Sequence, residues 1–282
     1  MRGIAAVVAL LMVGLAITAC APSDPQPGEL PAGVSVELIQ LRSDVVGRTA
    51  QLRLKNAGED DLVVTRISLT DARFETPIVR DKRSPVSAGR TLDMRVDLPP
   101  VVCDKDGAAE STTLELEYEL GGRTEVAEAS VPDSLAFIPL LHQKECLRER
   151  LAEVVALSWA AFEPSDVGAP ASLTLDISPS GGEGEARIDT VETTNLLMFD
   201  PSGAAPFVVG AEVDGSRESQ RVRVPLVPLR CDPHAVMEDK RGTIFDITVA
   251  TGGAAGVVEV AVPAEIKGEI LAWVADWCGF GG

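Results

Sequence analysis

Residues 92–104 read Leu92-Asp93-Met94-Arg95-Val96-Asp97-Leu98-Pro99-Pro100-Val101-Val102-Cys103-Asp104, and residues 221–232 read Arg221-Val222-Arg223-Val224-Pro225-Leu226-Val227-Pro228-Leu229-Arg230-Cys231-Asp232. Both stretches alternate between apolar and polar residues, continue into a proline-rich segment and end in Cys-Asp. A period of two is typical of a half-buried β-strand. The two stretches therefore predict two strands, and their likeness suggests a duplicated unit.

The sequence that follows each Cys-Asp pair supports the duplication. Alternating runs cover residues 113–120 and 243–250, a glycine pair comes next, and third runs cover residues 124–131 and 257–262. In each copy a proline then opens a helical stretch that ends in a second cysteine. Five features recur in the same order, which favours duplication over chance similarity between two β-rich regions.

Four cysteines belong to these two units, and their spacing predicts how they pair. Cys103 and Cys146 are 43 residues apart, and Cys231 and Cys278 are 47 residues apart. An even number of cysteines outside the cytosol is typical of disulfides, although sequence alone allows three pairings of four cysteines. The duplication favours the pairs within each unit, Cys103–Cys146 and Cys231–Cys278.

The residues before each repeat add further strands. The predicted strands are 34–41, 49–56, 62–69 and a shorter run near 74–79 in the first unit, and 154–162, 172–178, 186–194, 196–199 and 207–213 in the second. About seven short strands per unit, with turns every 8–12 residues, predict a two-sheet sandwich. The fold class is therefore mainly β, with two tandem sandwich domains that each end in a short disulfide-pinned helix.

The strand count and spacing over residues 33–278 resemble tandem immunoglobulin-like β-sandwiches. The predicted domains are residues 33–147 and 154–278, joined by a linker at 148–153 and followed by a short tail at 279–282. One departure is evident, because each cysteine pair would tie a loop to a terminal helix and would not bridge the two sheets across a buried tryptophan.

The first twenty residues form an export signal. Arg2 precedes an apolar run over residues 3–16, and the run closes with Ile17, Thr18, Ala19 and Cys20. This ending resembles the lipobox of bacterial lipoproteins. The resemblance implies that residues 1–19 are removed and that Cys20 carries lipid, which would hold the exported protein on the outer face of the cell membrane. The alternative, a membrane-spanning anchor, needs about 20 apolar residues and fits this shorter run less well.

Residues 20–32 predict an extended tether, because prolines at 22, 25, 27 and 31 interrupt any helix. The composition is also informative. Arginine outnumbers lysine 19 to 6, as in bacteria with GC-rich genomes such as actinomycetes, and the formal net charge is −18. Such an acidic chain without a basic patch excludes nucleic acid as an expected partner.

The sequence offers little for catalysis or for binding a cofactor. Its two histidines, His142 and His234, lie four and three residues from Cys146 and Cys231, so a zinc site is an alternative to the disulfides. The histidines do not occupy matching positions in the two units, which favours disulfides. The motifs of serine hydrolases, zinc proteases and phosphate loops are absent. We therefore expect no enzyme activity, no metal and no cofactor.

Trp273 and Trp277 belong to an apolar stripe at helical spacing near the end of the second unit. The stripe predicts a helix packed across one end of the sandwich, and the alternative is a tryptophan-lined binding surface. For the whole chain, we expect a non-catalytic binding or structural role in the cell envelope, with an envelope protein or a wall polymer as the partner. A lipoprotein that carries a solute or lipid to a membrane machine is the second hypothesis, and an unrecognised hydrolase is the third.

Overall fold

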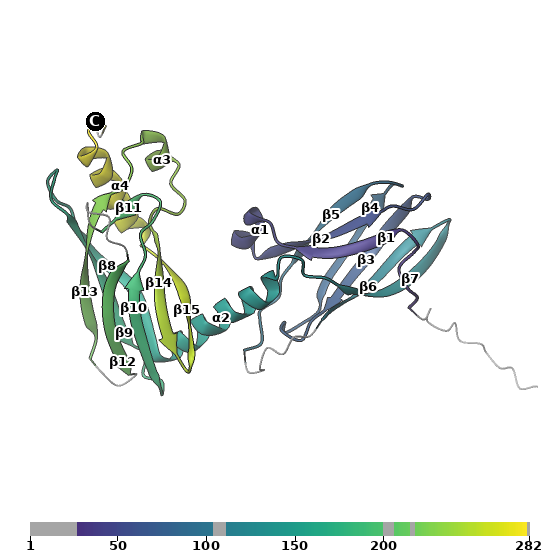
Figure 1. Cartoon of the computed structure of the whole chain (residues 1–282), viewed down its shortest axis with the longest axis horizontal. Coiled ribbons are helices and arrows are strands. Elements are labelled where there is room, and N and C mark those ends of the chain that lie inside the picture. The colour runs from purple at the N-terminus through teal and green to yellow at the C-terminus, as the bar shows by residue number, and fades with distance from the viewer. Residues whose placement is uncertain (1–26, 104–110, 200–205, 215–217, 281–282) are drawn as a thin grey trace, which may run out of the picture.

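The computed structural model describes residues 27–103, 111–199, 206–214 and 218–280. Their strands form four antiparallel sheets, which face each other in pairs as two sandwiches (Figure 1). The prediction of a mainly β chain with two tandem immunoglobulin-like sandwiches is confirmed. The helices of the described residues all fall short of the length and hydrophobicity that a membrane crossing requires.

The first sandwich has seven strands. One sheet has the order β1-β2-β5 and the other has the order β4-β3-β6-β7. The strands are β1 (Val34–Ile39), β2 (Thr49–Asn56), β3 (Leu62–Thr70), β4 (Ile78–Val86), β5 (Thr91–Asp97), β6 (Thr112–Leu120) and β7 (Arg123–Val131).

The second sandwich repeats this order and adds a two-residue strand. One sheet has the order β11-β13-β9-β8 and the other has the order β12-β10-β14-β15. The strands are β8 (Val155–Glu163), β9 (Ala171–Pro179), β10 (Glu185–Val191), β11 (Leu197–Met198), β12 (Phe207–Asp214), β13 (Gln220–Pro228), β14 (Ile244–Thr251) and β15 (Ala254–Ala261).

The two sandwiches correspond strand by strand, as a duplication requires. The quoted repeat forms β5 and β13, and each of these strands pairs with the second strand of its unit. The edge strands β4 and β12 also correspond, since each pairs with the third strand of its unit across a bulge. The charges of β4 and β12 differ, because β4 carries three basic residues and β12 carries none.

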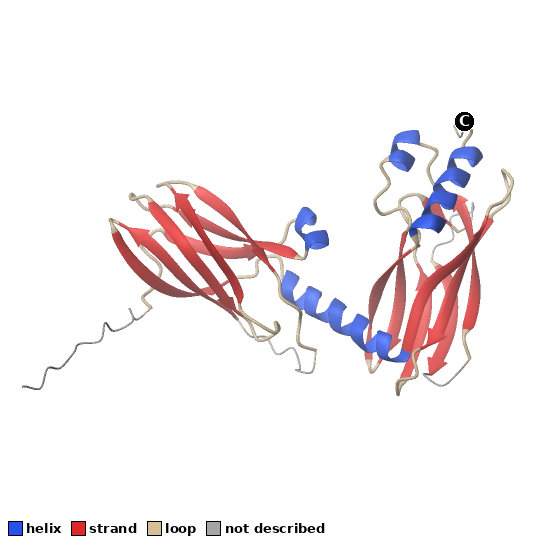
Figure 2. Cartoon of the chain, turned by 180° about the vertical axis from the view of Figure 1, so that it is seen from behind, coloured by secondary structure: helices blue, strands red, loops and turns tan. Residues whose placement is uncertain are grey.

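Four helices accompany the sheets: α1 (Arg42–Gly47), α2 (Phe137–Val154), α3 (Pro233–Met237) and α4 (Ala264–Trp277). Helix α4 lies across one end of the second sandwich (Figure 2). It buries Ile270, Trp273 and Val274, which belong to the same hydrophobic core as Trp159 and Phe245. The amphipathic stripe of the sequence therefore forms a closing helix, as the packing interpretation expects.

Helix α2 belongs to both sandwiches. Its first part contributes Phe137, Ile138 and Cys146 to the core of the first sandwich. Its last part contributes Leu147, Leu151 and Val154 to the core of the second, where the helix packs against β15, β8, β14 and β10. The first unit therefore does not end in a short helix at Cys146, because the same helix continues for two more turns into the second core.

Polar contacts reinforce this junction. Lys144 Nζ on α2 donates to Glu259 Oε1 on β15 at 2.7 Å, and Arg241 Nη2 lies 3.3 Å from the same oxygen. The hydrogen bond from Lys144, assisted by Arg241, holds the pKa of Glu259 below its ordinary value despite partial burial. A continuous helix packed into both cores gives the sandwiches a defined mutual orientation (Figure 1).

Candidate functional site

Cys20, which is predicted to carry the lipid, lies outside the described residues. So do the lipobox residues Ile17, Thr18 and Ala19. The described chain begins at Pro27, and its first contact is with β7. Gly28 N donates to Val126 O at 2.9 Å, and Glu128 N donates to Gly28 O at 2.8 Å. The tether therefore joins the first sandwich along the β7 edge.

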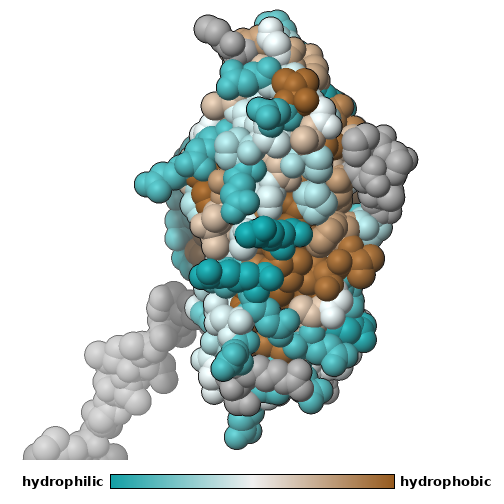
Figure 3. All heavy atoms as spheres, turned by 90° about the vertical axis from the view of Figure 1, so that its left-hand side faces the viewer, coloured by the Kyte–Doolittle hydropathy of each residue, from teal (hydrophilic) through white to brown (hydrophobic). Residues whose placement is uncertain are grey.

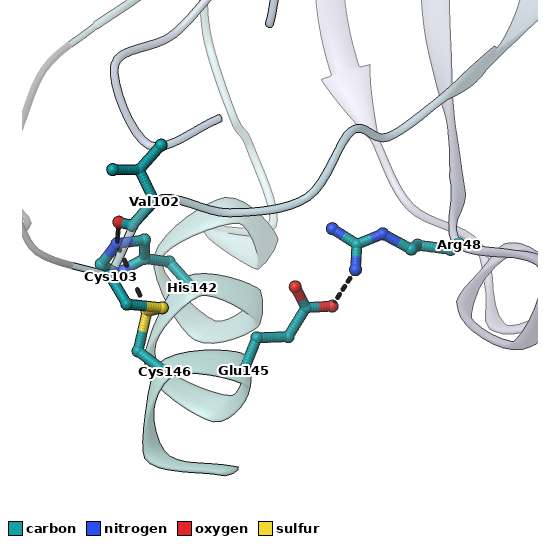
Figure 4. The surroundings of a disulfide bond; sticks show 6 residues. All are labelled: Arg48, Val102, Cys103, His142, Glu145 and Cys146. Carbon is teal, nitrogen blue, oxygen red and sulfur yellow. Dashed lines mark hydrogen bonds and ion pairs between the residues drawn. A yellow bond between two sulfur atoms is a disulfide. The ribbon is translucent and has the colours of Figure 1, made fainter. Parts of the chain in front are cut away.

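The structure contains the two disulfides that the duplication predicts, Cys103–Cys146 and Cys231–Cys278. The first bond joins the end of the loop after β5 to α2, and its surroundings fix the helix (Figure 4). His142 Nε2 lies 2.8 Å from Val102 O, and Arg48, at the end of α1, forms an ion pair with Glu145. Disulfides of this kind are typical of proteins that fold in an oxidising compartment outside the cytoplasm.

The same bonds remove the zinc alternative, because all four cysteines that could bind the metal are oxidised. The histidines lie in different sandwiches: His142 is on α2 and His234 is on the short helix α3. Over the described ranges, no three histidine, cysteine or acidic side chains gather in an arrangement that could hold a metal ion.

The two tryptophans singled out as a possible binding surface have different surroundings. Trp273 is 5% exposed, its indole N–H donates to Ser165 O at 3.1 Å, and its ring contacts Phe162. Trp277 is partly exposed and packs against Trp273 with ring centroids 5.4 Å apart. Trp273 is therefore a core residue, and of the two only Trp277 offers surface to a partner.

A buried ion pair holds the loop after β3. Asp71 receives hydrogen bonds from Arg73 Nε at 2.8 Å and Nη2 at 2.6 Å, and from Thr112 Oγ1 at 2.7 Å. Burial raises the pKa of the Asp71 carboxyl, but these hydrogen bonds outweigh it and hold the pKa below the ordinary value. The carboxylate is thus engaged in structure, tying the loop to β6.

We expect Asp71→Asn to destabilise the first sandwich by about 3–5 kcal/mol, because it removes the negative charge that the buried Arg73 guanidinium contacts through two hydrogen bonds. The lowered pKa means that the contribution of Asp71 is fully present above about pH 4 and fades as pH falls through the folded-state pKa. Denaturant unfolding between pH 3 and 7 can be followed by far-UV circular dichroism. The free energy of unfolding of the wild type should exceed that of Asp71→Asn by an amount that shrinks toward pH 3. A difference in free energy of unfolding that stays constant with pH would contradict this role of the Asp71 carboxylate.

A groove opens along the edge of the first sandwich opposite the tether. Strands β4 and β7 are the two ends of one sheet, and β5 and β1 are the two ends of the other. The groove lies between β4 and β5, which are adjacent but do not pair, and has a volume of about 610 Å³. Its lining includes Arg80, Lys82, Arg83, Leu92, Met94 and Arg95.

The cations of this groove are largely unneutralised, although the whole chain is acidic. Arg83 pairs with Glu119, and the rim acid Asp93 pairs with Arg53. Within the described chain, no carboxylate lies within ion-pair distance of Arg80, Lys82 or Arg95, and Asp97 is the acid on the rim that stays free of a cation. The groove therefore carries surplus positive charge.

Arg80 has the most distinctive position of the three cations. It shares the face of buried Ile78 and is itself partly buried, while its guanidinium donates to Lys82 O at 2.8 Å and to Ser84 Oγ at 2.9 Å. Burial lowers the pKa of Arg80, with no acid nearby to oppose the shift. A partly desolvated guanidinium without a carboxylate favours an anionic ligand.

Exposed apolar side chains occur on both sandwiches. Figure 3 views the second sandwich from the side away from the first, and hydrophobic side chains gather toward one side of that face. The most exposed apolar side chains of the second sandwich are Val167, Val208, Leu229, Met237 and Val257. Single exposed apolar residues are common on protein surfaces, so this feature is less specific than the charged groove.

The groove was not predicted from the sequence, because most of β4 lies beyond the predicted strand. The run Arg80-Asp81-Lys82-Arg83 lacks apolar alternation, so the predicted strand stopped near residue 79. A signal was nevertheless available. Three cations within four residues form the densest basic cluster of a chain that carries 43 acidic and 25 basic residues.

Comparison with known proteins gives no family for this chain. No family model matches the sequence, and no curated protein matches it. Among solved structures, red sea bream transglutaminase shares 12% identity over 82% of this chain at a TM-score of 0.26, and this chain spans 31% of its length. The chaperone–tip adhesion subunit complex of Csu pili from Acinetobacter baumannii shares 12% identity over 77% of this chain and 92% of its own, at a TM-score of 0.21. The bacterial integrin-binding protein invasin shares 11% identity over 82% of this chain and 39% of its own, at 0.20. At these TM-scores none of the likenesses bears on function.

Proposed function

We propose that this protein is a lipid-anchored, extracytoplasmic lipoprotein with a non-catalytic binding role in the cell envelope. The observation that carries the proposal is the basic groove between β4 and β5, with Arg80 partly buried and free of any carboxylate. The groove lies on the edge of the sandwich opposite the tether, so a chain anchored through Cys20 would present it away from its own attachment. No observation on the described residues favours the carrier or the hydrolase hypothesis.

The arrangement of the domains supports the same proposal. Helix α2 contributes side chains to both cores, so the two sandwiches act as one elongated body and not as independent modules on a flexible string. The disulfides fit a protein that folds after export. Such a body on a proline-rich tether suits a protein that holds a partner at a fixed distance from the membrane.

The test is crosslinking and co-purification of the protein from its native membrane, with Cys20→Ala as the control. We expect the wild-type protein to fractionate with the membrane and to recover a specific envelope protein or polymer. We expect the control to leave the membrane fraction, since removing the thioether removes the anchor. A Cys20→Ala protein that stays membrane-bound would contradict the anchor, and a wild-type protein that recovers no partner would contradict the binding role.

A further inference from the structure

The groove between β4 and β5 combines charge with open strand edges. Strand β4 pairs only with β3, and β5 pairs only with β2, so each presents one unpaired side in the described structure. Unpaired edges can accept the backbone of another extended chain. From these two features we infer that the groove binds an acidic, extended segment of a partner protein, which adds as a strand along β4 and places its carboxylates against Arg80 and Lys82, with Arg95 adding positive charge to the groove lining.

The duplication shows that the fold itself does not demand these cations. Strand β12 holds the place of β4 in the second sandwich, and its residues, Phe207 to Asp214, include no lysine or arginine. The two arginines of β13 each lie near an acid, since Arg221 is 3.8 Å from Asp176 and Arg223 is 3.9 Å from Glu163. Two copies of one architecture thus differ at this edge, and the difference is a set of free cations.

Protection of the edge against aggregation accounts for only part of the pattern. Exposed charges, a bulge and a proline all blunt a free strand edge, and β4 has exposed Lys82 and Arg83, a bulge and Pro85. Arg80 does not fit that role, because it is partly buried beside Ile78 and faces the crevice between the sheets. Pro85 lacks a backbone donor, so strand addition would use the part of β4 that precedes it.

The position of the groove favours a peptide over other anionic ligands. The membrane of the protein's own anchor would lie toward the β7 edge, where the tether joins, and the groove opens on the opposite edge. An unpaired strand edge offers backbone donors and acceptors, which an extended peptide can use and a charged polymer without a peptide backbone cannot. This inference rests on the proposed binding function and names the partner's chemistry.

The experiment measures binding of a fluorescent octapeptide of alternating glutamate and valine to the full chain carrying Cys20→Ala, by anisotropy at low salt. The comparison peptide alternates glutamate and proline, which keeps the charge and removes half of the backbone donors. We expect the glutamate-valine peptide to bind about tenfold more tightly than the comparison peptide, since strand addition depends on those donors. Equal binding of the two peptides would overturn strand addition.

The protein variants test the site. Arg80→Gln with Lys82→Gln and Arg95→Gln should weaken binding of the glutamate-valine peptide about tenfold or more, because it removes three positive charges from the groove lining. A matched control, Arg221→Gln with Arg223→Gln and Lys240→Gln, removes the same charge from the second sandwich and should change affinity less than about twofold. Lys82→Gln with Arg95→Gln keeps the Arg80 contacts to β4 and should still weaken binding if the triple variant misfolds. Equal losses in the groove and control variants would overturn the site.

Two further probes test the other classes of anionic partner. Tighter binding of inorganic polyphosphate than of the peptide would overturn the peptide in favour of a wall polymer. Groove-dependent binding of phosphatidylglycerol vesicles would overturn it in favour of a membrane surface. The proposed function fails separately: a partner recovered equally well by wild-type and groove-variant proteins from native membranes would sink this inference and leave the binding role intact.

Discussion

Leu151→Ala in the full chain should lower the stability of the second sandwich by about 2–5 kcal/mol and leave the first sandwich unchanged. Leu151 is on α2 and 4% exposed, and it belongs to the second core together with Leu147 and Val154. Its truncation would open a cavity between the helix and the sheet of β15. The effect is expected although the residue precedes the first strand of the second sandwich.

The chain carries its own reporters for this measurement. All three tryptophans, Trp159, Trp273 and Trp277, belong to the second sandwich, and the single tyrosine, Tyr118, belongs to the first. Tryptophan emission therefore follows the second sandwich alone during denaturant unfolding, while far-UV circular dichroism follows both. The matched control is Glu149→Ala, on the exposed side of the same helix, with an expected change within about 0.5 kcal/mol. An unshifted tryptophan transition in Leu151→Ala would show that α2 is not part of the second core.

The behaviour of α2 also shows where sequence reasoning was sufficient and where it was not. Alternation and the paired cysteines predicted the sandwiches, because both signals are local or set by the repeat. The continuation of α2 past Cys146 depends on where Leu147 and Leu151 find a partner surface, and that surface is assembled from strands more than a hundred residues later, such as β15. The charged segment 148–153 is compatible with a continuous helix or a tight connector, but its sequence does not show that the helix enters the second core.

The groove illustrates a second limit. A strand at the edge of a sheet has one side in solvent, so its residues need not alternate, and β4 escaped detection beyond residue 79. Arg80, Lys82 and Arg95 line one groove only because β4 and β5 are adjacent edges of different sheets. Composition predicted an acidic surface, yet four basic side chains line this groove and, among the described residues, only Arg83 of the four has an ion pair, with Glu119.

The tryptophan stripe is a case in which the sequence was sufficient. Its helical spacing predicted a helix packed on the sandwich, and the structure confirms that packing. Ile270, Trp273 and Val274 recur at helical spacing, and all three are buried on the side of α4 that packs on the core. The stripe could not show how firmly α4 is attached, because Cys278 forms its disulfide with Cys231, in the loop that follows β13. That attachment can be measured.

Replacing Cys231 and Cys278 together by serine should destabilise the second sandwich by about 4 kcal/mol. The disulfide closes a loop of 47 residues, and cutting it restores the conformational entropy of that loop to the unfolded chain. Because Trp273 and Trp277 lie on α4, its release should also shift tryptophan emission to longer wavelength before the sheets unfold. The measurement is denaturant unfolding by tryptophan emission under oxidising conditions.

The other disulfide provides the matched control, since it closes a loop of 43 residues in the first sandwich. Cys103→Ser with Cys146→Ser should lose a similar free energy, seen by far-UV circular dichroism, and should leave the tryptophan midpoint in place. Phe137 and Ile138 still dock α2 on the first core in that variant, and Leu147 and Leu151 still dock it on the second. If both double variants lowered the tryptophan midpoint equally, the two sandwiches would unfold as one cooperative unit through α2, and the separate assignment of the two disulfides would be wrong.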